Sequence, residues 1–252
     1  MTEKTYEMNT KELTDLMMLR QQEAILEIKE NMGIIAQFHL NKNKNSHPEV
    51  ISITIMNSKR LLNELKRVQK IKPEGISIQP KDPKDLYKLI GTFNGLPDSP
   101  YQQGSYEVDL NIPKEYPINP PKAYFITKVW HPNISSVTGC ICLDILSNKW
   151  ALSHNLLSVM AGISSLLIQA EPNDPQDAIV AKQYLNDRDL FDKTAAFWNH
   201  FYAGGPRKDG FDEFESKISH LREMGYTTDA SIHSLSMWNW DLDEAKRDLS
   251  NN

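Results

Sequence analysis

The period of the hydrophobic pattern changes near Trp150, and this change restricts the chain to a fold that combines a sheet with helices. Before this residue, apolar side chains alternate with polar ones over 106–112, which predicts a strand with one buried face. After it, apolar residues recur every three or four positions over 156–167, which predicts an amphipathic helix. A sheet followed by helices is the order of an α+β fold.

Two further apolar runs, 87–93 and 123–126, are short enough to be strands and lie on either side of the alternating run. Turns rich in Pro, Gly and Asn separate these runs at 95–100 and 116–121. Successive strands joined by such turns predict an antiparallel meander.

Helices are predicted before and after these strands. One starts near Ser58, and its apolar face is formed by Leu61, Leu62, Leu65 and Val68. Ser153 is the predicted N-cap of the helix that follows the sheet. Two more helices are predicted at about 177–185 and 189–202, after a Pro-rich break.

Both ends of the chain lie outside this predicted α+β unit of residues 58–203. Residues 1–57 are expected to form an extension, helical or partly disordered, in which a capping signal at Asn9 precedes an apolar stripe. The stripe comprises Leu13, Met17, Ala24, Ile28 and Ile35. A polar linker is predicted at 41–45. The extension is either an arm that binds a partner or a loosely packed tail.

The C-terminal 42 residues, 211–252, are predicted to fold as a small helical domain behind a hinge at 204–210, which begins with Gly204-Gly205-Pro206. Their apolar residues recur at helical spacings. The set is Ile218, Leu221, Ile232, Leu235, Trp240, Leu242, Ala245 and Leu249.

Composition narrows the classes of partner and location. The chain is 40% hydrophobic and can bury a core, whereas its net charge of −5 and the lack of a long basic run argue against nucleic-acid binding. Neither a membrane span nor a signal peptide is recognisable, so we expect a protein of the cytoplasm or the nucleus. The cysteines, Cys140 and Cys142, are too close in sequence for an unstrained disulfide, and free thiols are expected.

The local sequence leaves several interpretations of Cys142 open. Between Ile141 and Leu143, it can be a small buried hydrophobic residue. It can also join Cys140 and His131 at a metal, but a structural zinc site needs four ligands and no second cysteine pair exists, so neither metal nor cofactor is expected. A papain-like nucleophile would need a base and an orienting group that the sequence does not place.

Five short motifs follow one another between Leu96 and Pro175. They are Leu96-Pro97-Asp98-Ser99-Pro100-Tyr101, Tyr116-Pro117-Ile118-Asn119-Pro120-Pro121, Trp130-His131-Pro132-Asn133-Ile134, Gly139-Cys140-Ile141-Cys142-Leu143-Asp144 and Glu171-Pro172-Asn173-Asp174-Pro175. In this order they resemble the motifs of ubiquitin-conjugating enzymes. The resemblance covers about residues 58–203 and implies a four-stranded antiparallel meander between an N-terminal helix and C-terminal helices.

The resemblance implies that Cys142 accepts ubiquitin as a thioester from the activating enzyme and passes it to a lysine amine. Asn133 would either donate a hydrogen bond to the oxyanion of the second step or hold the active-site loop in place. Asp174 would orient the amine and lower its pKa, or would only form a turn before the next proline. His131 would be structural.

The same resemblance implies surfaces that bind the activating enzyme and ubiquitin ligases. The residues expected there are Lys59, Arg60, Lys66, Arg67, Ile118 and Trp150. Taken alone, the four basic residues are typical of a solvated helix face. Ile118 replaces a Phe that is common in the family, and Cys140 replaces a common small residue and is expected to be a packed, neutral thiol.

The C-terminal part carries a second set of motifs, Met224-Gly225-Tyr226, Leu235-Ser236 and Trp240-Asp241-Leu242-Asp243-Glu244-Ala245. These are similar to a ubiquitin-associated domain, a small three-helix bundle, which implies ubiquitin contacts by Met224, Gly225, Tyr226 and Leu249. A helical bundle without this function is the alternative. Asp248 and Ser250 interrupt a leucine pattern, and we expect them to weaken packing or ubiquitin contact.

The expected function is that of a ubiquitin-conjugating acyltransferase with a ubiquitin-associated tail, which builds polyubiquitin chains of the type read by the proteasome. Expected partners are ubiquitin, its activating enzyme, ligases and substrate proteins, with neither nucleic acid nor membrane. The alternatives are a conjugating enzyme for another ubiquitin-like modifier and a non-catalytic ubiquitin-binding variant. Cys142, Asn133 and Asp174 argue against the second alternative, and the tail argues against the first.

Overall fold

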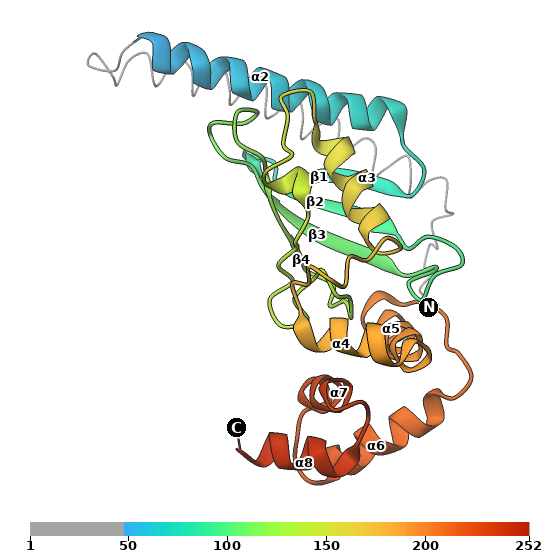
Figure 1. The fold of residues 1–252 in the computed structure, drawn as a ribbon. Coiled ribbons are helices and arrows are strands. Elements are labelled where there is room, and N and C mark those ends of the chain that lie inside the picture. Colours follow the sequence, from blue (N-terminus) through green and yellow to red (C-terminus); the bar gives the residue numbers. More distant parts are fainter. Residues whose placement is uncertain (1–47, 252) are drawn as a thin grey trace, which may run out of the picture.

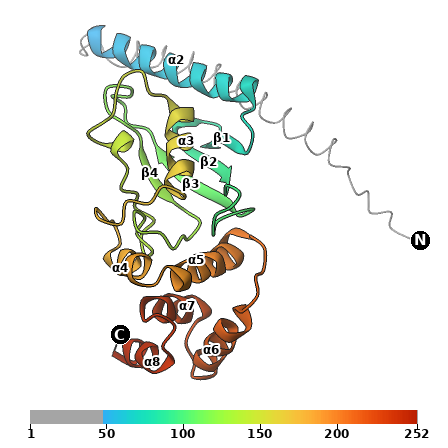
Figure 2. The ribbon, with the colours of Figure 1, turned by 45° about the vertical axis from the view of Figure 1, so that its right-hand side comes forward.

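The computed structural model describes residues 48–251, so the helix and linker predicted within residues 1–47 lie outside the described residues. Figures 1 and 2 show the sheet with a long helix at one end and helical layers at the other. The elements are α2 (Pro48–Ile71), β1 (Ile76–Asp82), β2 (Asp85–Asn94), β3 (Ser105–Asn111), β4 (Lys122–Phe125), the 3₁₀ turn η1 (Asp144–Leu146), α3 (Leu156–Leu166), α4 (Ala178–Asn186), α5 (Arg188–Ala203), α6 (Phe211–Glu223), α7 (Thr228–Met237) and α8 (Leu242–Asn251).

The sheet is an antiparallel meander in the order β1-β2-β3-β4, which confirms the predicted architecture. Residue patterning identified β2, β3 and β4, whereas β1 was implied only by the family resemblance. The reason lies in β1 itself, where Ile78 is the one fully buried residue among seven. Strand patterning is visible only where one face of a strand is buried.

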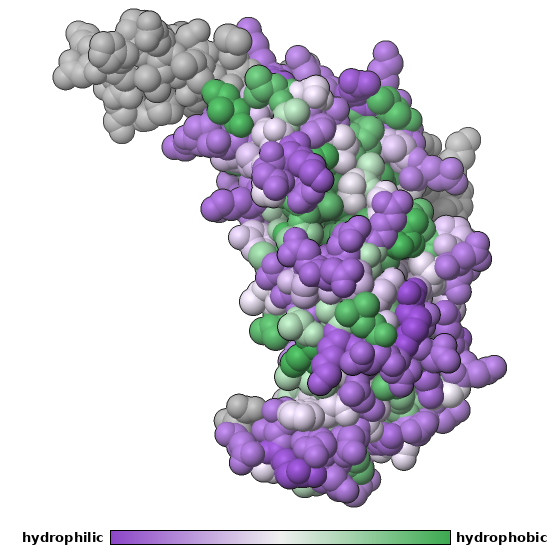
Figure 3. All heavy atoms as spheres, viewed as in Figure 1, coloured by the Kyte–Doolittle hydropathy of each residue, from purple (hydrophilic) through white to green (hydrophobic). Residues whose placement is uncertain are grey.

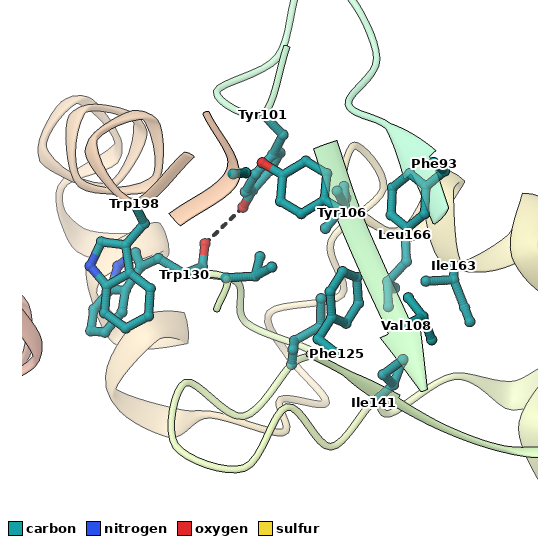
Figure 4. Close-up of a cluster of buried hydrophobic side chains, with 14 of the residues drawn as sticks. Phe93, Tyr101, Tyr106, Val108, Phe125, Trp130, Ile141, Ile163, Leu166 and Trp198 are labelled. Carbon is teal, nitrogen blue, oxygen red and sulfur yellow. Dashed lines mark hydrogen bonds between the residues drawn. The ribbon is translucent and has the colours of Figure 1, made fainter. Parts of the chain in front are cut away.

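The core lies between the sheet and α3. On β3, Tyr106, Val108 and Leu110 point inward as the alternation predicts. Helix and strand approach closely at Gly91 of β2, where a Cβ would come within 2.4 Å of the Met160 sulfur. Figure 4 shows how Tyr106, Phe125 and Ile163 gather in this core, and how the hydroxyl of Tyr101 donates to the carbonyl oxygen of Trp130.

Two helix starts differ from the sequence expectation. The first helix begins at Pro48 and not near Ser58. The helix after the sheet is capped by Asn155 rather than Ser153, because Asn155 and Ser158 exchange side-chain and backbone hydrogen bonds in a capping box. Asp177 caps α4, in agreement with the predicted helix at 177–185.

The tail forms a bundle of α6, α7 and α8, as predicted, and this bundle packs directly on α5 (Figure 2). The Trp240 indole N–H donates to Thr194 Oγ1 over 2.9 Å, and the Trp198 indole N–H donates to Ser236 Oγ over 2.9 Å. Phe197 of α5 meets the Trp240 ring edge-on, with centroids 5.3 Å apart. The segment 204–210 therefore links two parts that share one core and is not a free hinge.

Hydrophilic residues cover most of the tail bundle on the face seen in Figure 3. Among the helices of residues 48–251, none has both the length and the apolar character needed to cross a membrane.

Candidate active site

Cys142 is an exposed free thiol at the end of a short extended segment that lies alongside β4. Isolated bridges pair Cys140 with Tyr124 of β4, and Ile141 with Ile134. Ile141 is 8% exposed, whereas Cys140 is partly exposed and Cys142 is exposed. The interpretation of Cys142 as a small buried residue is therefore wrong.

Asn133 connects the Cys142 segment to the loop that carries Asp174. Its backbone carbonyl accepts a hydrogen bond of 2.9 Å from the Cys142 N–H. Its side-chain Nδ2 donates to the carbonyl oxygens of Glu171 and Asp174, each at 3.0 Å, and its Oδ1 accepts from the Glu171 N–H at 2.8 Å. Because Asn133 is only 2% exposed and both of its amide hydrogens are engaged, its side chain holds this loop.

Two exposed carboxylates, Asp174 and Asp144, act on the Cys142 thiol through their negative charges. Partial burial raises the pKa of the Cys142 thiol, and the negative charges of Asp174 and Asp144 raise it further. Asp144 also pairs with Lys149 at 2.5 Å. The thiol of Cys142 is therefore largely protonated near neutral pH.

The loop between α3 and α4 is fixed to the active-site segment at a second point. The backbone N–H groups of Gln176 and Asp177 both donate to the carbonyl oxygen of Pro132 over 2.9 Å. The Asp177 carboxylate accepts from the Ser136 hydroxyl over 2.7 Å. These bonds set the position of Asp174 relative to Cys142 without using either side chain.

His131 is structural, as the sequence indicated. It is 1% exposed, and its Nδ1 accepts a 3.0 Å hydrogen bond from the Asn133 N–H. Burial lowers the pKa of His131 to about 3, so the ring is neutral at physiological pH. Its Nε2 is buried and lacks a partner within hydrogen-bonding geometry.

The four basic residues of α2 do not form one equivalent surface. Lys59 and Arg67 are exposed, and Lys66 is partly exposed. Arg60 instead donates from Nη2 to the carbonyl oxygens of Leu152 and His154, each at 2.8 Å. Arg60 is therefore an internal brace between α2 and the 151–154 segment.

Ile118 and Trp150 lie in neighbouring loops. Ile118 is 67% exposed, and the Trp150 indole N–H donates to the carbonyl oxygen of Pro117 over 2.8 Å. The Trp150 ring also packs against Tyr116, with centroids 5.9 Å apart. These two contacts hold the loops together and leave the Ile118 side chain exposed beside them.

Glu64 is the residue of this region that sequence reasoning missed. Its Oε2 accepts hydrogen bonds from the Tyr116 hydroxyl at 2.7 Å and from the Leu156 N–H at 2.9 Å, while Oε1 pairs with Arg60 at 2.9 Å. Glu64 thereby joins α2, the 116–121 loop and the start of α3. The i,i+4 spacing from Arg60 does not distinguish this role, because Tyr116 and Leu156 are 52 and 92 residues away.

In the tail, Met224 is 49% exposed, and Gly225 has the φ of +99° that favours glycine. Tyr226 and Leu249 are partly buried against the bundle. Asp248 accepts a 2.7 Å hydrogen bond from the Ser234 hydroxyl, and Ser250 lies 3.2 Å from the Tyr226 hydroxyl oxygen. The two polar residues thus replace apolar contacts between helices by hydrogen bonds.

No cluster of three or more His, Cys, Asp or Glu side chains suited to a metal ion occurs within residues 48–251.

The groups that the structure brings together are the thiol of Cys142, the loop held by Asn133 and the carboxylates of Asp174 and Asp144. Lys59, Arg67 and Ile118 are exposed on α2 and the 116–121 loop, apart from these residues in the sequence.

Comparison with known proteins agrees with this arrangement. Residues 60–199 match the family model described as "Ubiquitin-conjugating enzyme". The chain is 42% identical over 201 residues to human "Ubiquitin-conjugating enzyme E2 K", covering 80% of this chain and 99% of the relative. It is also 42% identical over 198 residues to "Ubiquitin-conjugating enzyme E2-22 kDa" of Drosophila melanogaster, covering 79% of this chain and 98% of that protein.

Solved structures give the same result. The E2 domain of a ubiquitin conjugating enzyme from Toxoplasma gondii superposes with a TM-score of 0.55 at 41% identity, covering 58% of this chain and 99% of that one. A putative ubiquitin conjugating enzyme from Plasmodium yoelii gives a TM-score of 0.57 at 41% identity, covering 60% and 97%. The chain belongs to the ubiquitin-conjugating enzyme family and is a transferase of the ubiquitin pathway.

Proposed function

We propose that this enzyme accepts the C-terminus of ubiquitin as a thioester on Cys142 and transfers it to lysine amines. The observation that carries the proposal is an exposed free thiol held, through Asn133, beside the loop of Asp174. Partners in this reaction are ubiquitin, its activating enzyme, ligases and protein substrates. We place the reaction in the cytoplasm or the nucleus.

The first step exchanges one thioester for another. The Cys142 sulfur attacks the carbonyl carbon carried by the activating enzyme, a new S–C bond forms, and the activating enzyme's thiol leaves with the proton. Reactant and product are nearly equal in energy, so a strongly activated nucleophile is unnecessary. The raised pKa of Cys142 is compatible with this chemistry and keeps the unloaded thiol mostly protonated.

In the second step a lysine amine attacks the same carbonyl carbon, a C–N bond forms and the C–S bond to Cys142 breaks. The amine loses its proton, and the departing sulfur ends as a thiol. We propose that the exposed Asp174 carboxylate orients the amine by contact, while desolvation of the amine as it approaches the thioester lowers its pKa and favours its neutral form. Asn133 acts as a positioning residue, because both amide hydrogens bond to loop carbonyls.

We further propose that residues 58–203, 204–210 and 211–252 are the catalytic domain, its connection and a ubiquitin-associated domain. The exposed Met224 beside Gly225 and Tyr226 supports ubiquitin binding by the tail. Ubiquitin held there would supply acceptor lysines for chain building. The exposed residues Lys59, Arg67 and Ile118 are available for the activating enzyme and ligases.

Loading in vitro tests the proposal. The full chain is incubated with activating enzyme, ATP and labelled ubiquitin, and non-reducing gels are read with and without a thiol reductant. Wild type should give a reductant-sensitive adduct, Cys142→Ser a resistant oxyester, and Cys140→Ala a normal thioester. Loss of the adduct in Cys140→Ala, or loading by another ubiquitin-like modifier in place of ubiquitin, would overturn it.

A further inference from the structure

The extended segment that presents Cys142 presents a second thiol on the same side. Ile141, between the two cysteines, turns its side chain into the core and is 8% exposed. Alternation along an extended chain therefore directs Cys140 and Cys142 away from the core together. Both are free thiols, and Cys140 is among the groups that act electrostatically on Cys142.

The backbone fixes this pair at both ends. The carbonyl oxygen of Cys140 accepts from the Ser135 N–H at 2.9 Å, and the N–H of Cys142 donates to Asn133 at 2.9 Å. The preceding residue, Gly139, accepts from the Phe125 N–H at 2.8 Å. The two thiols are therefore held ready in their mutual arrangement, which reduces the entropy lost when both bind one ligand.

The spacing of the two cysteines excludes an unstrained disulfide and favours an atom that bridges both sulfurs. Residues two apart in an extended chain have Cα atoms about 6.6 Å apart, and same-face Cβ atoms stay well beyond the ~3.8 Å of an unstrained disulfide. An inserted atom that forms a bond of roughly 2.3 Å to each sulfur removes this conflict. Zinc would need four ligands, and no cluster of even three is present among the described residues.

We propose that Cys140 and Cys142 form a dithiol site that chelates trivalent arsenic and related neutral, thiophilic groups that need only two sulfur ligands. With an arsine oxide, two As–S bonds form, the As=O bond breaks, and the oxygen leaves as water with the two thiol protons. No oxidant or reductant is required. Occupation would mask the nucleophile of the proposed thioester reaction.

The charges around the site select the kind of reagent. Asp144 and Asp174 place negative charge beside Cys142, which disfavours anionic thiol reagents. A neutral arsenical meets no such repulsion. Release of both thiol protons in the water product also avoids a build-up of negative charge at the site.

The test uses the reduced full chain treated with phenylarsine oxide and then challenged with excess monothiol, before intact-mass spectrometry. Wild type should retain one phenylarsenic group, whereas Cys140→Ala and Cys142→Ala should each lose it. The reagent concentration that gives half-occupancy should be at least tenfold lower for wild type than for Cys140→Ala. Subsequent 2,3-dimercaptopropanol should remove the group from wild type.

A second readout follows ubiquitin loading after removal of free reagent, with each variant compared with its own untreated sample. Treated wild type should lose loading and regain it with the dithiol. Equal retention of phenylarsenic by wild type and Cys140→Ala, or no retention by either, would overturn the dithiol site. Retention of the group with loading unaffected would leave the site intact and would instead contradict the proposed role of Cys142.

Discussion

The backbone N–H of Cys142 donates a 2.9 Å hydrogen bond to the carbonyl oxygen of Asn133, whose buried amide holds the loop of Asp174. Asn133 therefore contacts both the backbone that carries the thiol and the loop that carries the carboxylate. This arrangement separates two roles for Asn133. A loop brace contributes to stability, whereas an oxyanion donor contributes only to the rate.

We predict that Asn133→Ala lowers the free energy of unfolding by about 1–3 kcal/mol, because the loop loses hydrogen bonds that are partly buried. Discharge to lysine should slow while the thioester still forms. Urea unfolding and single-turnover discharge measure the two effects. Asn173→Ala, at an exposed neighbouring position, is the control. Slow discharge with unchanged stability would favour direct contact with the oxyanion.

The reactivity of Cys142 should depend on pH through its raised pKa. The thiolate fraction increases as pH rises through the pKa, so alkylation by iodoacetamide should reach half its maximum above the pH typical of cysteine. Asp174→Asn and Asp144→Asn each remove a negative charge and should move this midpoint to lower pH. The measurement uses a Cys140→Ala background, with Asp209→Asn as the control. An unmoved midpoint in both variants would leave burial as the single cause.

Protonation of His131 should destabilise the fold in acid. Its folded pKa of about 3 lies below the ordinary 6.5, so the unfolded chain binds a proton that the folded chain does not. Stability from this group is therefore complete above pH 6.5 and falls as pH decreases toward 3, by about 2 kcal/mol between pH 7 and pH 5. His131→Asn offers Oδ1 in place of Nδ1 to the Asn133 N–H. Its urea-unfolding free energy should change less over this pH range, and an equal change would contradict the assignment.

Removal of the Glu64 carboxylate should destabilise the fold where α2 meets the 116–121 loop and the start of α3. Glu64→Ala leaves the Tyr116 hydroxyl and the Leu156 N–H without their acceptor, which should cost about 2–4 kcal/mol. The Glu64→Ala/Tyr116→Phe double variant also lacks the hydroxyl. Its loss of stability should therefore be smaller than the sum of the losses of the two single variants. Urea unfolding of the four proteins gives this coupling. Simple additivity would show that the contact contributes little.

Contact between the tail and α5 should contribute to the stability of the whole enzyme. Ser236→Ala removes the buried acceptor of the Trp198 indole N–H and should lower the free energy of unfolding by about 1–3 kcal/mol. Ser219→Ala, on the exposed face of α6, should have little effect. A chain that ends at Gly204 should still load ubiquitin in the cold, but it should melt at a lower temperature. Equal melting temperatures for the truncated and full chains would contradict the shared core.

The elements that sequence predicted best are those whose pattern is local. The alternation through Tyr106, Val108 and Leu110 identified β3, and Asp177 marked the start of α4 because an N-cap acts within one turn. Ser153 and Asn155 are both good caps two residues apart, and only the reciprocal bond with Ser158 decides between them.

The features that sequence could not predict depend on contacts between distant segments. Glu64 reaches the N–H of Leu156, and Trp198 finds Ser236 on a helix of the tail. Such pairs leave no trace in hydrophobic periodicity, because the pattern of each segment is the same whether or not its distant partner is present. The same limit explains why the sequence did not reveal that Arg60 braces α2 against the 151–154 segment, whereas its place in a partner-binding surface stays a prediction.

Trp240 packs against Phe197 and donates to Thr194, and these contacts fix the orientation of the tail bundle relative to α5. On a flexible linker, a bound molecule samples a cloud of positions, and its average concentration near a distant group depends on linker length. When the bundle is fixed in this way, the averaging over positions disappears, and a molecule bound to the bundle is presented in one orientation. The orientation of α7 and α8 would then determine which surface groups of a molecule bound to the tail face the rest of the enzyme.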